Sequence, residues 1–119
     1  MTEKKIKIKT PEFEAKADLL EDKTPNTCKN ILKELPLEGK ASLYKEEIYF
    51  SVPMKIEPEN ATEDTKAGDV SYWPEGPAIC IFFGESKPVS PVNTFARIKE
   101  NTKRFANVKK EEKIKVLKC

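Results

Sequence analysis

The feature that most constrains the fold is a strict alternation of apolar and polar residues at the start of the chain. Residues 5–9 read Lys-Ile-Lys-Ile-Lys, and after Thr10-Pro11 the same period of two continues through residues 13–19. Side chains of a β-strand point alternately to opposite faces, so each run predicts a strand with one buried face. Two such runs around a short turn predict an antiparallel hairpin.

The same kind of pattern recurs along the 119 residues and predicts seven or eight short strands. One of them, residues 78–83, is apolar on both faces, which predicts a central strand with both sides covered. Two proline-containing stretches, residues 53–66 and 85–92, predict surface loops. The other expected strands are residues 47–52, 69–73, 94–99 and 112–118.

One segment follows a helical period instead, and it predicts an α-helix over about residues 25–35. Thr24 is the expected N-cap, and Pro25 suits the first helical position, where a missing N–H costs nothing. Pro36 is expected to end the helix. The apolar stripe, at spacings i, i+3, i+4 and i+7, consists of Cys28, Ile31, Leu32 and Leu35.

Many short strands and one helix indicate a mainly β fold, a small closed antiparallel barrel forming a single domain over residues 1–119. Ile6 and Ile8 near the start are mirrored by Ile114 and Val116 near the end. We expect the two end strands to pair and so to close the sheet, which would remove its exposed edges.

Composition excludes several classes of function. The chain has no histidine, which removes Ser–His–Asp triads and imidazole metal sites. It has no cluster of metal ligands and no glycine-rich phosphate loop, so no cofactor or metal is expected. It also has no apolar run of 18 residues and no signal-peptide core, so membrane attachment is not expected.

The cysteines and the charges bear on the cellular setting. Cys28, Cys80 and Cys119 form no CxxC pair, and we expect the first two to be small apolar core residues of a reduced, cytoplasmic protein. Lysine supplies 20 of the 22 basic residues and glutamate 16 of the 20 acidic ones, a skew similar to that of heat-adapted surfaces.

The clusters of charged residues are expected to lie on the solvated surface rather than to form catalytic sites. Glu46 and Glu47 are adjacent on a strand, so their carboxylates point to opposite faces and are expected to be solvated. Lysines gather at both ends of the chain and would form a positive face if those ends pair. The net charge is only +2 and few aromatic residues lie among the lysines, so nucleic acid is not the expected partner. RNA binding through the basic ends is the third of the three functions considered.

Aromatic residues supply the candidate binding surface. Tyr72, Trp73 and Pro74 are consecutive, and Tyr49 lies in an earlier strand. Tyrosine and tryptophan bury a large apolar area while keeping one polar group, and they often line peptide grooves. The alternative, that these rings cap an open end of the barrel, stays open.

Three stretches together resemble a known family: Glu47–Phe50 (EIYF), Gly68–Pro74 (GDVSYWP) and Ile81–Gly84 (IFFG). They are similar to the small prokaryotic and archaeal cyclophilin-like family, formerly known only as a domain of unknown function. The resemblance covers about residues 6–100. It implies a closed antiparallel barrel with little helix.

The wider cyclophilin comparison implies an altered groove. Phe83 matches the groove phenylalanine of the isomerases, whereas Ile81 stands where they carry a glutamine. Arg97 stands where a lysine is usual, and the Phe-His pair that precedes the catalytic arginine of cyclophilins is missing. The resemblance thus leaves an apolar groove with no confident catalytic residue. Its expected ligand-binding residues are Tyr49, Tyr72, Trp73 and Phe83.

Rotation about an X–Pro bond faces a barrier of about 20 kcal/mol because the amide is conjugated. An isomerase lowers that barrier with a donor, usually arginine, that interacts with the proline nitrogen. A groove without this donor binds ground state and transition state alike and gives little acceleration. We therefore expect a module that binds a proline-containing peptide or a small ligand. The alternative is a peptidyl-prolyl cis-trans isomerase that uses Arg97; the oligomeric state stays open.

Overall fold

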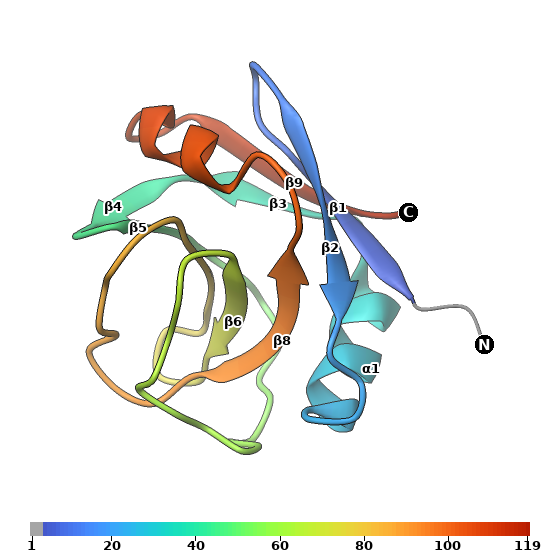
Figure 1. Ribbon diagram of the computed structural model, residues 1–119. Helices are drawn as coiled ribbons and strands as arrows, with labels where there is room; N and C mark the ends of the chain where they lie inside the picture. Colours follow the sequence, from blue (N-terminus) through green and yellow to red (C-terminus); the bar gives the residue numbers. More distant parts are fainter. Residues whose placement is uncertain (1–3) are drawn as a thin grey trace.

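The alternating runs form the strands of one antiparallel sheet, which a computed structural model describes for residues 4–119 (Figure 1). The sheet has nine strands and curls into a nearly closed barrel, so the expected fold class is confirmed. In chain order the elements are β1 (Lys5–Lys9), β2 (Glu14–Leu19), α1 (Pro25–Glu34), β3 (Leu37–Lys40), β4 (Ser42–Tyr44), β5 (Glu47–Ser51), β6 (Asp69–Trp73), β7 (Ala78–Phe82), β8 (Asn93–Ile98), the 3₁₀-helix η1 (Thr102–Asn107) and β9 (Lys113–Lys118).

The barrel does not close where the sequence suggested. The end strands do pair as expected, with Ile8 opposite Val116, but this pair lies inside the sheet, whose order is β3-β9-β1-β2-β8-β6-β7-β5-β4. The two outermost strands, β3 and β4, are parts of one bent segment separated only by Ala41. The first part pairs with β9 and the second with β5. This single segment therefore brings the ends of the sheet together.

Glycine is required at the point of closure. A Cβ atom on Gly39 in β3 would lie 2.9 Å from Cδ2 and 3.1 Å from Cβ of Phe50 in β5. Because Phe50 is itself buried in the core, its ring has little room to move away. The missing side chain of Gly39 lets the two ends of the sheet approach.

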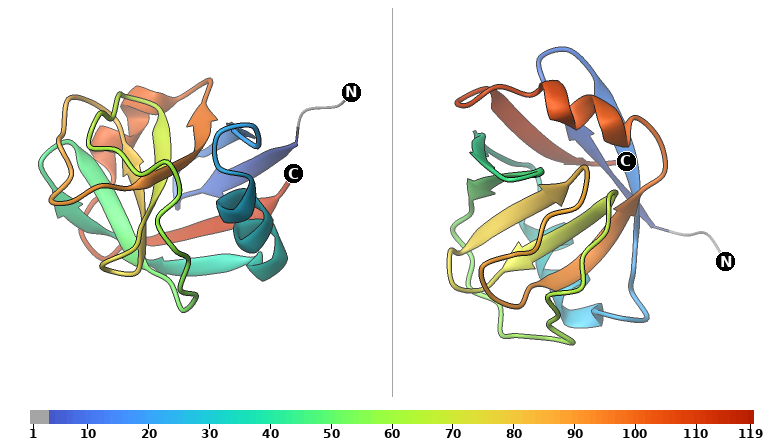
Figure 2. Two further views of the ribbon diagram at one scale, coloured as in Figure 1. Left: turned by 90° about the horizontal axis from the view of Figure 1, so that it is seen from below. Right: turned by 60° about the vertical axis from the view of Figure 1, so that its left-hand side comes forward.

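Two short helices lie at opposite ends of the molecule (Figures 1 and 2). The helix α1 is where the sequence predicted it, ends one residue earlier at Glu34, and buries Cys28 and Ile31 in the core. The 3₁₀-helix η1 was not expected; its Phe105 is fully buried and meets the ring of Phe13 edge-on at 4.9 Å between centroids. No helix in residues 4–119 is long and apolar enough to cross a membrane.

Thr24 occupies the N-cap position of α1 as predicted, but its side chain does not cap the helix. The hydroxyl of Thr24 donates to the Thr94 carbonyl oxygen in β8 rather than capping the helix. The carboxylate of Glu59, from the loop after β5, accepts hydrogen bonds from the main-chain N–H groups of Asn26 and Thr27 at 3.1 and 2.8 Å. A distant residue thus supplies the acceptor that the first turn of a helix needs.

That loop, residues 52–68, is irregular as predicted but is fixed to the barrel. The fully buried Tyr72 donates its hydroxyl hydrogen to the Met54 carbonyl oxygen at 3.0 Å. The same hydroxyl accepts a hydrogen bond from the Ile56 main-chain N–H at 2.8 Å. The tyrosine therefore satisfies two polar groups of the loop that the barrel wall would otherwise leave without partners.

Candidate functional site: a pocket on the outer face of the barrel

The candidate site lies on the outside of the barrel, over β5, β6 and β7. In β5, Ile48 and Phe50 enter the core, so the alternate residues Glu47 and Tyr49 face outward. In β7 the outward residue Cys80 lies opposite Tyr49 in register. The segment that follows β7 crosses this outer face, which explains why β7 is buried on both sides, as its sequence predicted.

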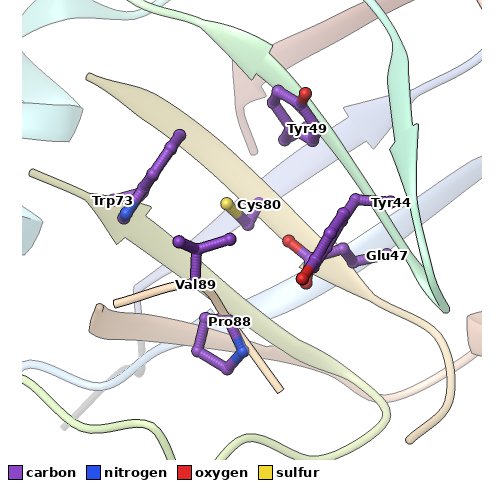
Figure 3. A pocket seen from close by; sticks show the side chains of 7 residues that line it. All are labelled: Tyr44, Glu47, Tyr49, Trp73, Cys80, Pro88 and Val89. Carbon is purple, nitrogen blue, oxygen red and sulfur yellow. The ribbon is translucent and has the colours of Figure 1, made fainter. Parts of the chain in front are cut away.

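These residues enclose a pocket of about 60 Å³ (Figure 3). Trp73 from β6 and Tyr49 from β5 stand on either side of Cys80, with their rings edge to face at 79° and 6.4 Å between centroids. Val89, from the crossing segment, lies beside the thiol, and Pro88 lies farther from it on the same segment. Val89 is 68% exposed, an unusual position for a large aliphatic residue. The lining consists of Tyr44, Glu47, Tyr49, Trp73, Cys80, Pro88 and Val89.

The position of the Trp73 ring depends on a neighbouring glycine. A Cβ atom on Gly76 would lie 2.9 Å from Cε3 of Trp73, so any larger residue at position 76 would clash with the ring. The indole N–H points to the crossing segment and donates to Oγ of Ser90 at 2.6 Å. The ring is thereby held with one edge in the pocket wall.

Glu47 is the one acidic residue in the lining, and it corrects an expectation. Its neighbour Glu46 is exposed as predicted, but Glu47 is only 4% exposed. Its Oε2 atom accepts a hydrogen bond from the hydroxyl of Ser86 at 2.8 Å. Burial raises the pKa of the Glu47 carboxyl above its usual value; hydrogen bonds from Ser86 and Cys80 and the charge of Lys45 oppose the rise without cancelling it.

Cys80 is buried as expected, but it lies beneath the pocket rather than in the inner core. Burial, together with the adjacent charge of Glu47, raises the pKa of its thiol far above the ordinary range. The group therefore stays protonated at neutral pH and is a poor nucleophile. Cys28, in α1, is also buried, which raises the pKa of its thiol to about 11.

The structure brings together only two of the four predicted ligand-binding residues. Tyr49 and Trp73 face each other across the pocket, whereas Tyr72 is completely buried and does not line it. Adjacent residues of a strand point to opposite faces, so Tyr72 and Trp73 do not share a surface. Phe83 continues the inward series of β7 and packs against the core. The prediction missed Tyr44, Glu47, Cys80, Pro88 and Val89.

Arg97 lies outside this pocket. Its Nε–H donates to Oδ1 of Asp69 at 3.1 Å, and the Asp69 side chain is 4% exposed against 42% for Arg97. The other carboxylate oxygen of Asp69 accepts from the main-chain N–H of Lys66, so the aspartate also fixes the turn before β6, as a turn residue should. Arg97 is not among the residues of the pocket lining.

The paired end strands carry the lysine-rich face. Several of its charges are matched by acids on neighbouring strands: Lys5 with Asp18, Lys7 with Glu14, and Lys113 with Glu38, at 3.3 to 3.7 Å. Residues 4–119 contain no group of three or more metal-ligating side chains. The pocket over β7 brings two tyrosines, a tryptophan and a buried carboxylate together.

Comparison with known proteins places this barrel in a family. Residues 4–117 match the family model described as Cyclophilin-like. The fold is similar to the solution structure of the hypothetical protein AF2241 from Archaeoglobus fulgidus, with a TM-score of 0.84 and 30% identity over 98% of this chain and 95% of that one. It is also similar to a structure of McbB in complex with tryptophan, at 13% identity, with a TM-score of 0.80 over 95% of this chain and 44% of that one.

At 13% identity the likeness to McbB concerns the fold alone. No curated protein matches the sequence. The match over residues 4–117 spans nearly all of the chain, in agreement with the barrel and with the EIYF, GDVSYWP and IFFG stretches. The chain belongs to the Cyclophilin-like family.

Proposed function

We propose that the protein is a binding module whose outer pocket takes one compact apolar side chain, such as a proline ring, of a peptide or small ligand. The observation that carries the proposal is the facing pair of Tyr49 and Trp73 over a cavity on the outer face of the barrel. Rigid aromatic residues gathered in one place are typical of recognition surfaces.

The size of the pocket limits the ligand. Sites for whole small molecules and cofactors usually enclose about 300–1,000 Å³. A cavity of about 60 Å³ has room for roughly the volume that two water molecules occupy in the liquid. This supports insertion of a single side chain, with the rest of the ligand lying along the surface.

The chemistry of the lining favours binding over catalysis. An isomerase needs a fixed donor beside the proline nitrogen, and neither lysine nor arginine is among the lining residues. Arg97 is engaged by Asp69 elsewhere on the barrel. The Cys80 thiol is protonated, and Glu47 already accepts a hydrogen bond.

Fluorescence provides the test, because Trp73 is the only tryptophan and lies in the pocket wall. We expect proline-containing peptides to shift its emission in a saturable titration. Tyr49→Ala should weaken that binding by about fivefold, because edge-to-face partners contribute roughly 1 kcal/mol beyond their buried area. Leu43→Ala, which truncates an exposed side chain on the neighbouring strand β4, is the matched control. Equal affinities of the wild type and Tyr49→Ala would exclude this pocket.

An assay of prolyl isomerisation distinguishes the alternative function, a peptidyl-prolyl isomerase, from a binding module. We expect cis–trans interconversion of Xaa-Pro peptides to proceed at the uncatalysed rate, and we expect Arg97→Ala to bind peptide as the wild type does. Acceleration that disappears in Arg97→Ala would instead favour an isomerase with an atypical donor.

A further inference from the structure

The segment that crosses the pocket, residues 85–91, is here called the strap. It joins β7 to β8 and runs over the outer face of β7 (Figure 3). Although it is a surface loop with four exposed residues, Ser86 and Pro88 are buried in it. The strap thus inserts a hydroxyl and a proline ring toward the barrel.

Side chains alone hold the strap in place. Within residues 4–119, none of residues 85–91 makes a main-chain hydrogen bond to another main-chain group. The hydroxyl of Ser86 donates to Glu47, and its carbonyl oxygen accepts from the Thr65 hydroxyl at 2.7 Å. At the other end Ser90 accepts from the indole N–H of Trp73. Lys87 forms an exposed ion pair with Glu63 at 3.4 Å.

Two of these contacts are made to residues of the pocket lining. Glu47 is a nearly buried acceptor, and the Trp73 indole is a donor whose edge lies in the pocket wall. Between these two contacts the strap contributes Pro88 and Val89 to the pocket lining, and Val89 lies beside Cys80. The strap therefore presents, in order, a hydroxyl donor to Glu47, an apolar ring, an aliphatic side chain and a hydroxyl acceptor to Trp73.

We infer that the strap is a built-in occupant of the binding groove, and that the ligand replacing it is a peptide segment with a hydroxyl residue two positions before and two positions after a proline. This inference rests on the function proposed above and specifies its ligand and its regulation. A ligand without these hydroxyls would, on displacing the strap, take the Ser86 donor from Glu47 and the Ser90 acceptor from the indole N–H, and the loss of hydrogen bonds at buried polar groups is costly. The tethered strap competes with every ligand, so it sets a threshold for binding.

Opening of the strap can be measured without any ligand, through the cysteines. Cys80 lies under the strap, Cys28 lies in α1 far along the chain, and Cys119 is exposed. In the full chain with Cys119→Ser, alkylation by a small maleimide is followed at each buried thiol by peptide mapping. Ser86→Ala with Ser90→Ala removes both hydroxyl contacts of the strap and leaves every groove residue unchanged. Ser51→Ala, an exposed serine of β5, is the matched control.

We expect Cys80 to react about 25-fold faster in the double variant, because each of the two lost hydrogen bonds is worth roughly a factor of five. The rates of Cys28 and of the Ser51→Ala control should not change. An unchanged Cys80 rate, or equal acceleration of Cys28 and Cys80, would refute an opening strap, since the second result means that the whole protein unfolds.

The ligand is tested with the blocked peptide Ser-Lys-Pro-Val-Ser and with Ala-Lys-Pro-Val-Ala, using Trp73 emission. Apparent affinity scales with the population of the open state, so the double variant should bind the serine peptide more tightly by the factor measured for Cys80. Equal binding of both peptides, or no binding of either while other proline peptides bind, would refute the ligand assignment alone. Faster Cys80 alkylation with no response to any peptide or small ligand would instead refute the proposed function.

Discussion

The closure of the barrel at Gly39 makes a sharp prediction about stability. In Gly39→Ala the new methyl group would lie 2.9 Å from Cδ2 and 3.1 Å from Cβ of Phe50, well inside ordinary carbon–carbon contact distance. Overpacking of this kind in a core costs about 1–3 kcal/mol. We therefore expect Gly39→Ala to lower the free energy of unfolding by about 1–3 kcal/mol.

The sign of the effect distinguishes this reasoning from the general behaviour of glycine. Gly39 does not have a positive φ angle. At such a position alanine normally stabilises a protein by about 0.4–1 kcal/mol, because it restricts the unfolded chain. Only the close approach of Phe50 reverses the expected direction.

Urea unfolding at pH 7 measures the change. With a slope near 2 kcal/mol per molar, the midpoint should fall by roughly 0.5–1.5 M without a change in slope. Combining the change with Phe50→Leu, which removes the flat ring, should make the two losses less than additive, as for residues in contact. A midpoint equal to or above that of the wild type would show that β3 and β5 do not meet as described.

Three further substitutions test the loop anchor, the helix cap and the buried carboxylate. Tyr72→Phe should lower the free energy of unfolding by roughly 1–3 kcal/mol in thermal or urea unfolding, because it leaves two buried main-chain groups without their partner. The control Tyr49→Phe should change it by less than about 0.5 kcal/mol. Equal effects of the two substitutions would contradict this anchoring role. Glu59→Ala should cost about 0.5–2 kcal/mol at neutral pH. Burial disfavours the charged form of Glu59, but hydrogen bonds from Thr27 and Asn26 outweigh burial and lower the pKa of this carboxyl. The cap therefore stabilises the fold above the ordinary carboxyl pKa, and the stability lost in Glu59→Ala should shrink as the pH falls below that value. A loss of equal size at pH 3 would argue against the cap. Burial raises the pKa of the Glu47 carboxyl, so the folded protein loses stability as the pH rises from the ordinary carboxyl pKa through the raised one. The free energy of unfolding of Glu47→Gln should therefore increase relative to that of the wild type between pH 4 and pH 7. Parallel pH profiles of the two proteins would rule this out.

The candidate site was partly predictable from the sequence. Tyr49 and Trp73 were expected at a binding surface, and they do face each other. The period of two along β6 would have separated Tyr72 from Trp73, since neighbouring residues in a strand face opposite sides. The run of apolar residues in β7 also predicted a cover for its outer face, but nothing in the sequence pattern indicated that residues 85–91 would supply it.

The sequence by itself determined α1 and seven of the nine strands, because the spacing of apolar residues records which face of each element is buried; it did not indicate β3, β4 or η1. It also indicated that the two end strands pair. Tertiary structure alone decided where the barrel closes, which residue caps α1 and what covers the pocket. These features depend on contacts between distant parts of the chain, such as Glu59 with Thr27 and Ser86 with Glu47. Local periodicity carries no record of such contacts, since it reflects only the burial of each segment and not the identity of its neighbour.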